Sequence, residues 1–465
     1  MDAAIEQTIK EKSIPGGVLW LEHNGVAYHE AYGKRALIPA EEPMTEETIF
    51  DIASLTKVVA TTPAMMLLIE RGKVRLEDRV QKFIPEFKGS GKENITIRHL
   101  MTHTSGFPSG LGRAIPWSGY DTAIRKACQE RLENPPGTHF RYSDINFIVL
   151  GDVVKRVSGK PLNEFAEQEI YRPLLMRDTR FLPPPAWRPS IAPTEKVDDR
   201  VLRGVVHDPT SQLMGGVAGH AGLFTTASDL ARYARMILNG GELEGTRIFK
   251  PGTVKLMASV QSPDEVPSRR GLGWDIDSAY SRPRGKWFPL GSFGHTGFTG
   301  TSLWIDPFSR TFWIFLSNRV HPSRSGNVLP LQARLADLCA EAVRDFDFNN
   351  VPGELPFRPG TEGPATTIRA KTSGALNGID VLSKSQFALL KGLRVGLVTN
   401  HTGRDRNGTQ TIDLLARAPD VKLKVLFSPE HGIRGALDEK VADSVDQKTG
   451  LPVYSLYGTR RIPAP

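Results

Sequence analysis

Cysteine is nearly absent from this 465-residue chain, and only Cys128 and Cys339 occur. Two cysteines cannot build a disulfide framework or a thiolate metal cluster, so neither feature is expected. Long hydrophobic runs are also missing. No stretch approaches the ~20 apolar residues that span a bilayer, and the N-terminal MDAAIEQTIKEKSIPGG lacks the apolar centre of a secretory signal. We therefore expect no transmembrane segment, and either a cytoplasmic protein or one whose leader is not part of this sequence.

The chain also lacks a large excess of positive or negative charge. Lys and Arg number 59 against 51 for Asp and Glu, a small excess for this length, and the basic residues are dispersed. Nucleic-acid-binding proteins concentrate basic and aromatic residues in patches, so we expect no nucleic-acid partner. A weak attraction to anionic cell-wall polymers fits the excess equally well.

Turn and helix-end signals predict the organisation of the first 348 residues. Two alternating apolar runs flank Asn24-Gly25 in GGVLWLEHNGVAYHEAYG, which predicts a tight hairpin, and TSLWIDPFSRTFWIFLSN predicts a second one around residues 307–310. Between them, KVVATTPAMMLLIERG, DINFIVLGDVVKRVSG and SDLARYARMILNGG read as helices closed by glycine. We predict an α+β domain in which an antiparallel sheet, built from both chain ends, is flanked by helices with an inserted helical lobe.

A change of composition predicts a second domain. Residues 349–373 are rich in Pro, Gly and Thr without periodicity, which is typical of a linker. In residues 374–465, LRVGLVTN, TQTIDLLARA and VKLKVLFS read as strand, helix and strand. This order predicts a β-α-β unit, and hence an α/β domain with a parallel sheet.

The segment FDIASLTKVVATTPAMMLLIERG contains a candidate nucleophile and base. If Ser54 begins a helix, Lys57 lies one turn later on the same face, where its amine can reach the serine hydroxyl. Lysine acts as a base only when neutral, and we expect the surrounding apolar residues to lower its pKa by burial. Taken alone, the pattern favours a helix-capping Ser54 with a solvated Lys57.

Two further motifs, FRYSDINFIVLG and SFGHTGFTGTSLWIDP, change that balance. Together with ETIFDIASLTK, ITIRHLMTHTSGFP and GGVAGHAGLFTTASDLARYA, they resemble the class C β-lactamase and penicillin-binding-protein-like family over roughly residues 1–345. The resemblance implies a β-lactamase-like fold and catalytic roles for three residues. Ser54 would be acylated, Lys57 would accept its proton, and Tyr142 would pass protons to the leaving group. It also implies an oxyanion hole formed by the backbone N–H groups of Ser54 and Phe298.

The predicted substrate-binding residues include two departures from the family pattern. Asp144 replaces the usual asparagine of the second motif. His295 replaces the usual lysine of the third, and a largely neutral imidazole holds a carboxylate poorly. This argues against efficient β-lactam hydrolysis and favours the esterase, D-aminopeptidase or muramyl-amidase branches. The other predicted substrate-binding residues are His220, Thr296, Gly297 and Phe298. We interpret His99, His103 and His207 as structural, and we expect no metal and no cofactor.

The second domain has a resemblance of its own. GIDVL, VGLVTNHTG, LFSPEHGIRG and DQKTGLPVYSLYG resemble the opening of the exo-β-N-acetylmuramidase family, which removes N-acetylmuramic acid from peptidoglycan fragments. A glycosidase needs carboxyl groups beside the scissile bond, and Glu430, after a predicted strand, is the candidate catalytic acid or base. The family is longer than residues 374–465, so we interpret this domain as truncated and without glycosidase activity on its own.

The two resemblances together favour one function. A serine hydrolase that removes stem peptides would act directly before a muramidase, so we expect amide cleavage in muramyl peptides during cell-wall turnover or recycling. The expected partners are peptidoglycan fragments or other small amides and esters. The resemblance implies a periplasmic or cell-envelope location, while the sequence leaves a cytoplasmic one open, as it does the oligomeric state. Alternatives are a carboxylesterase or D-aminopeptidase of the same fold, and a non-catalytic peptidoglycan-binding module.

Overall fold

The computed structural model describes residues 1–112, 116–358, 377–400, 402–405, 408–428, 433 and 443–456. The chain divides into two compact units, Met1–Thr367 and Ile368–Pro465. Of the predicted linker, residues 359–373 lie outside the described part of the chain, and residues 349–358 contain no helix or strand.

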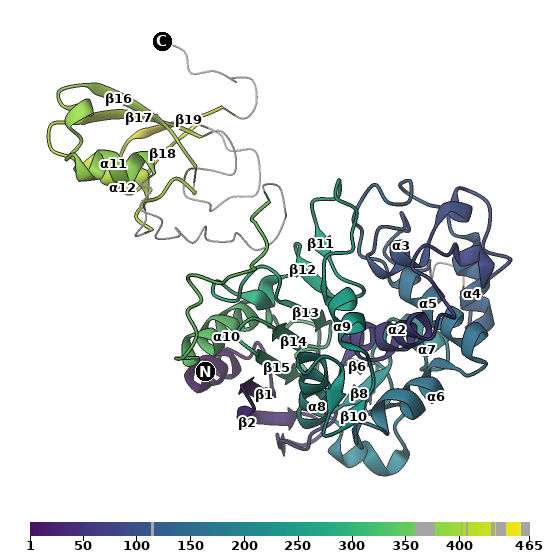
Figure 1. The fold of residues 1–465 in the computed structure, drawn as a ribbon. Coiled ribbons are helices and arrows are strands. Elements are labelled where there is room, and N and C mark those ends of the chain that lie inside the picture. The colour runs from purple at the N-terminus through teal and green to yellow at the C-terminus, as the bar shows by residue number, and fades with distance from the viewer. Residues whose placement is uncertain are drawn as a thin grey trace. The chain divides into compact units, whose positions relative to one another are not determined.

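The first unit is built on an eight-stranded sheet in the order β11-β12-β13-β14-β15-β1-β2-β3 (Figure 1). All its pairs are antiparallel. Its strands are β1 (Gly16–His23), β2 (Val26–Ala36), β3 (Glu42–Pro43), β11 (Arg269–Arg270), β12 (Asp275–Asp277), β13 (Phe293–Gly297), β14 (Thr301–Asp306) and β15 (Thr311–Ser317). Because β1 pairs with β15, the sheet unites segments from both ends of this unit, as the hairpin signals predict.

The two predicted hairpins are confirmed. Asn24 and Gly25 have φ angles of +49° and +82° between β1 and β2, the left-handed values that a two-residue turn requires. The second hairpin joins β14 to β15, whose residues pair from Ser302 with Phe315 to Asp306 with Thr311. Turn chemistry is local, so it can be read from a few residues.

Helices cover both faces of the sheet. The helices α1 (Asp2–Lys10) and α10 (Leu329–Ala342) pack on one face with Trp313 and Phe315 of β15. The neighbouring residues of the same strand, Ile314 and Leu316, belong to the larger core on the other face, with α8 (Ala227–Leu238). This alternation is the two-residue period of a strand that is buried on both sides.

A helical lobe is inserted between β3 and β11. Its helices are α2 (Thr62–Glu70), α3 (Ile97–Met101), α4 (Tyr120–Gln129), α5 (Asp144–Ser158), α6 (Leu162–Ala166), α7 (Pro209–Leu213) and α9 (Pro251–Ala258), besides α8. A small sheet in the order β4-β8-β5 joins β4 (Phe50–Asp51), β8 (Leu223–Thr225) and β5 (Arg180–Phe181). The short pairs are β6 (Lys196–Val197) with β7 (Arg200–Val201) and β9 (Glu242–Leu243) with β10 (Thr246–Arg247). The predicted helices over KVVATTPAMMLLIERG, DINFIVLGDVVKRVSG and SDLARYARMILNGG correspond to α2, α5 and α8.

The run that enters α2 is irregular and buried. It begins as a 3-10 turn, η1 (Ala53–Leu55), continues as a π-helical turn, η2 (Lys57–Thr61), and then becomes regular α-helix. Among the described residues, Ala53–Glu70 is long and apolar enough to cross a membrane, but 83% of it is buried inside the protein. A core helix of a globular domain has the same length and composition.

The second unit has a small mixed sheet in the order β16-β17-β19-β18. Strands β16 (Arg394–Val398), β17 (Lys422–Ser428) and β19 (Pro452–Ser455) are parallel, and β18 (Ser444–Val445) pairs antiparallel with β19. The helices are α11 (Gly378–Lys384) and α12 (Thr411–Arg417). The predicted β-α-β unit is therefore present as β16-α12-β17, and β18 adds an antiparallel strand that the sequence analysis did not include.

Candidate active site

Ser54 lies in η1, directly after a backbone position of unusual geometry. Ala53 has a φ of +44°, a left-handed conformation that residues with a Cβ seldom adopt. The Asp51 carboxylate holds this turn by accepting hydrogen bonds from the Ala53 N–H (2.9 Å) and the His207 N–H (2.6 Å). Strained backbone of this kind clusters at active sites, where surrounding contacts fix a reacting side chain in place.

Lys57 begins η2, and its side chain is fully buried. Its Nζ donates hydrogen bonds to Ser54 Oγ (3.0 Å), Asp144 Oδ1 (2.7 Å) and the His220 carbonyl oxygen (3.2 Å). An ammonium group has three donors, and here each has an acceptor. The three-residue spacing thus brings the predicted nucleophile and base into contact.

The charge state of Lys57 differs from the expectation. Burial lowers the pKa of this amine, but the Asp144 carboxylate and Tyr142 outweigh it, and the net effect is a raised pKa. The expected lowering by burial is present, but the net direction of the pKa shift is opposite to the one expected. The pKa of Lys57 is raised because Asp144 has a carboxylate where the family usually has an amide, and this carboxylate stabilises the ammonium form.

Tyr142 is fixed by aromatic neighbours just before α5. Its ring stacks on His103, with 4.5 Å between ring centroids, and lies 5.1 Å from the Tyr280 ring. Lys57 Nζ lies 4.9 Å from the Tyr142 ring centroid, and this tyrosine contributes to the raised pKa of the amine. His103 itself accepts a hydrogen bond from the Ser143 N–H (3.1 Å), which agrees with the structural role expected for it.

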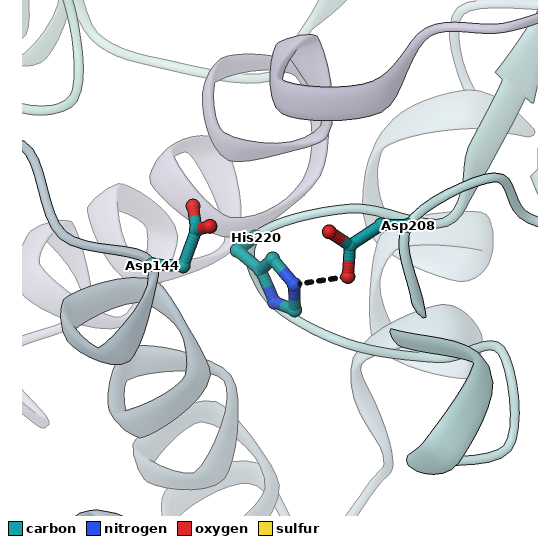
Figure 2. A group of neighbouring side chains, drawn as sticks. All are labelled: Asp144, Asp208 and His220. Atoms are coloured by element: carbon teal, nitrogen blue, oxygen red, sulfur yellow. Dashed lines mark hydrogen bonds and ion pairs between the residues drawn. The ribbon is translucent and has the colours of Figure 1, made fainter. Parts of the chain in front are cut away.

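Asp144, His220 and Asp208 lie together (Figure 2), and Lys57 contacts the first two of them. His220 Nε2 is 2.8 Å from Asp208 Oδ1, and the His220 side chain is only 1% exposed. Although burial would raise the pKa of Asp208, the charge and hydrogen bond of His220 hold it below its usual range. Three ligand-type atoms thus lie within 4.8 Å of one another, but the Lys57 ammonium already supplies a positive charge to Asp144. We assign no metal to this group.

The structure places two predicted substrate-binding residues outside the cavity beside Ser54. Asp144 instead forms an ion pair with Lys57, and His220 holds Asp208. The glycine-rich loop before His220 approaches α5, because a Cβ on Gly219 would lie 1.9 Å from the Phe147 carbonyl oxygen. Close packing between two backbone segments accounts for this glycine.

The third motif, which begins at His295, occupies the end of β13 that lies next to η1. His295 Nδ1 donates to the Thr296 carbonyl oxygen (2.7 Å). Burial, followed by the charges of Arg270 and Lys57, holds the pKa of His295 well below its usual range, so the imidazole is neutral. A Cβ on Gly297 would lie 2.3 Å from the Ile52 carbonyl oxygen, so only glycine lets β13 approach η1 this closely.

A cavity of about 500 Å³ opens beside Ser54. Its lining is mainly apolar and includes Tyr142 and all four residues from His295 to Phe298, so the three motifs meet at one site. The Phe298 side chain is 51% exposed and stacks on His207, with 5.7 Å between ring centroids. The remaining lining residues are Asp275, Ala279, Tyr280, Arg282, Pro283, Arg319, Gly326, Asn327, Val328, Leu329 and Gln332.

Sequence reasoning missed three residues of this region. Asp208 precedes a proline at the start of α7 and caps that helix through the Ser211 N–H (2.7 Å), a pattern that predicts a helix start but not its contact with His220. Tyr280 and Arg319 lie in irregular segments, and only the folded chain brings them to Ser54. Glu430, the predicted acid or base of the second domain, lies outside the described residues.

A serine, a buried lysine and a tyrosine meeting between a helical lobe and an antiparallel sheet define a serine hydrolase of the penicillin-recognising class. The chain belongs to the beta-lactamase family, whose model matches residues 1–338. Residues 395–465 match the model described as exo-beta-N-acetylmuramidase NamZ, N-terminal. Both predicted resemblances are confirmed.

Curated relatives and solved structures agree with this family. A protein of Escherichia coli (strain K12) named "Putative D-alanyl-D-alanine carboxypeptidase" is 32% identical over 358 residues, which is 69% of this chain and 82% of the relative. A relative of the same name from Salmonella agona is 32% identical over 63% of this chain and 74% of its own length.

Two solved structures share the fold. One is EstCE1, a hydrolase with promiscuous acyltransferase activity, at a TM-score of 0.58 and 24% identity over 72% of this chain and 96% of its own. The other is the octameric penicillin-binding protein homologue from Pyrococcus abyssi, at a TM-score of 0.57 and 24% identity over 72% of this chain and 76% of its own. At this identity the two structures show the fold alone.

Proposed function

We propose that the first unit hydrolyses amide bonds of peptidoglycan-derived muramyl peptides through an acyl-enzyme on Ser54. The observation that carries the proposal is the contact between Lys57 Nζ and Ser54 Oγ (3.0 Å), with the Tyr142 ring centroid 4.9 Å from the same amine. A nucleophile needs a proton acceptor within this distance, and a leaving amine needs a proton donor.

The resting site has to move one proton before Ser54 can attack. Because its raised pKa keeps Lys57 an ammonium, this amine first has to lose a proton, and the neutral amine then takes the proton of the Ser54 hydroxyl at 3.0 Å. The Ser54 Oγ–carbonyl carbon bond forms, the carbon–nitrogen bond breaks, and the leaving nitrogen receives a proton from Tyr142. Lys57 then returns a proton to Tyr142. Water next attacks the carbonyl carbon of the acyl-enzyme and gives up a proton to the neutral Lys57, the bond from this carbon to Ser54 Oγ breaks, the carboxylic acid leaves, and Lys57 returns the proton to Ser54 Oγ.

The oxyanion of the tetrahedral intermediate would be held by the backbone N–H groups of Ser54 and Phe298. Both residues line the same cavity, and the turn after β13 is tied to the segment before η1. The Thr299 hydroxyl donates to the Asp51 carbonyl oxygen (2.7 Å), and the Thr301 hydroxyl donates to that of Ile52 (3.1 Å). Preset donors of this kind are a large electrostatic contribution to acyl transfer.

The choice of muramyl peptides rests on the second unit. Its muramidase-type domain is of a family that acts on N-acetylmuramic acid, and removal of the stem peptide exposes that sugar for the next step. The fusion would join consecutive reactions in one chain, and we assign the protein to the cell envelope on this basis. We further propose domain limits of 1–348 and 374–465, and Glu430 as the acid or base of the second domain.

The direct test is incubation with muramyl dipeptide and detection of free dipeptide. Wild-type protein should release it, and Ser54→Ala should not. No product at high enzyme concentration would overturn the amidase proposal. Labelling by a fluorophosphonate that is absent in Ser54→Ala would exclude a non-catalytic binding module, whereas absence of labelling in both proteins would support one.

A second candidate is a carboxylesterase or D-aminopeptidase of the same fold. The mainly apolar lining of the cavity, with Val328, Leu329 and Pro283, favours acyl groups less polar than a sugar acid. Faster turnover of p-nitrophenyl esters or D-amino-acid amides than of muramyl amides would select this function.

A further inference from the structure

Two arginines line the cavity beside Ser54, and they differ in their surroundings. Arg282 is exposed, whereas Arg319, which follows β15, is half-buried. Within residues 1–112 and 116–358, no carboxylate forms an ion pair with Arg319. The nearby Arg324 is paired, because its Nε donates to Glu195 Oε2 (2.8 Å).

The Arg319 side chain is held in place by its neighbours. Its Nη1 donates to the Gly326 carbonyl oxygen (2.9 Å), and its Cζ lies 4.6 Å from the Phe298 ring centroid. Its stem packs on Gly300, where an added Cβ would lie 2.9 Å from Arg319 Cγ. A guanidinium stacked on an aromatic ring and fixed through one nitrogen is preorganised to bind with the rest of its fork.

The Nε and Nη2 atoms of Arg319 are suited to bind a negatively charged group. Among the described residues, none accepts a hydrogen bond from Arg319 Nε or Nη2. Burial, and then the charge of Arg324, lower the pKa of Arg319. A half-buried cation without a counter-ion is costly, and a carboxylate matches two parallel N–H donors. His295, a polar residue of β13, is neutral and therefore offers no positive charge to such a carboxylate.

We propose that Arg319, backed by Phe298, binds a free carboxylate of the substrate, so that the site prefers N-acyl amino acids or N-acyl peptides with a free carboxylate over their neutral amides. This inference rests on the proposed amidase function and names its substrate class. In N-acetylmuramyl-L-alanine, the carboxylate belongs to the leaving amino acid. Nothing else in the proposed chemistry requires a charge on the substrate.

The test compares N-acetylmuramyl-L-alanine with N-acetylmuramyl-L-alaninamide, which differ only in that charge. On Ser54→Ala, calorimetry should give at least about tenfold tighter binding of the acid, since a charge-assisted bidentate contact is roughly twice as strong as a neutral one. Adding Arg319→Gln should remove the preference, and Arg319→Lys should keep part of it. Arg324→Gln is the matched control, since it removes one positive charge from the same loop and should keep the preference.

Each outcome has one meaning. Equal binding of acid and amide by Ser54→Ala overturns the carboxylate subsite, as does a preference that survives Arg319→Gln or is lost in Arg282→Gln alone. A preference that Arg324→Gln removes equally would assign it to the overall charge of the loop and also overturns the proposal. Thermal melts of every variant identify misfolding. If Arg319→Gln does not fold, Arg319→Lys takes its place in the test, and an undiminished preference for the acid in that variant overturns the proposal. If wild-type protein fails to cleave the bond between the muramyl group and L-alanine while the binding preference is intact, only the proposed amidase function is overturned.

Discussion

At Asp144, a carboxylate occupies the motif position where the family usually has an amide, and the structure connects this residue to the base. Asp144 raises the pKa of Lys57 against the opposite effect of burial. In Asp144→Asn, burial would dominate and the pKa of Lys57 would fall. The neutral amine would then form at lower pH, so the ascending limb of kcat/KM against pH should move to lower pH.

Profiles of p-nitrophenyl ester hydrolysis from about pH 5 to about pH 11, a range that extends past the ordinary lysine pKa of about 10.4, would measure this shift. Asp121→Asn is the control, because it removes a carboxylate from the same lobe at a side chain that is 82% exposed. An unmoved limb in Asp144→Asn would contradict the assignment of Lys57 as the titrating base.

Tyr142 and Tyr280 provide a second comparison between single residues. Both line the cavity and their rings are in contact, but Tyr142 is the one whose ring centroid lies 4.9 Å from Lys57 Nζ. Tyr142→Phe should lower kcat by about 10²- to 10⁴-fold, the usual contribution of a positioned proton donor. Tyr280→Phe should lower it by less than about tenfold. Steady-state kinetics on one amide substrate would decide, and equal losses would remove the special role of Tyr142.

At the scale of elements, the contact between β13 and η1 sets the geometry of the site. A Cβ on Gly297 would lie 2.1 Å from Thr301 Oγ1 and 2.3 Å from the Ile52 carbonyl oxygen. Gly297→Ala should therefore push β13 away from η1, destabilise the domain by about 1–3 kcal/mol and slow acylation of Ser54.

Denaturant unfolding and fluorophosphonate labelling rates would measure both effects of Gly297→Ala. The matched control is Gly252→Ala, at the start of α9, where an added Cβ would meet nothing within 4 Å. A Gly297→Ala protein with wild-type stability and labelling rate would show that this strand can shift without consequence.

The elements of the site could be predicted to different extents. Both hairpins and the helix α5 follow from local signals, such as Asn24-Gly25 and the closing Gly159, and the resemblance of three motifs brought Ser54, Lys57 and Tyr142 together. The order of the eight strands depends on pairings between distant segments, which no local pattern encodes. The π-helical turn at Lys57 and its ion pair with Asp144 also arise only from tertiary packing.

At the scale of the whole molecule, every described residue of the candidate hydrolase site belongs to the unit Met1–Thr367. The sheet and both large cores of that unit are internal to it. A chain that ends at Thr367 should therefore fold and keep its ester kcat/KM within roughly twofold, as expected for a domain with its own core.

Calorimetry on the full chain should in turn give two unfolding transitions, one of which matches that of the shortened chain. A shortened protein that lacks a cooperative transition, or that loses most of its activity at full solubility, would contradict the independence of the hydrolase unit.

The pairing of β1 with β15 has a consequence during synthesis. Gly17 pairs with Ser317, so the first hairpin waits for a partner that the ribosome adds about 300 residues later. At ordinary elongation rates of about 5–20 residues per second, that delay is roughly 15 to 60 seconds. During this time an edge rich in apolar side chains is open to wrong partners, and the nascent chain would benefit from a chaperone that covers it.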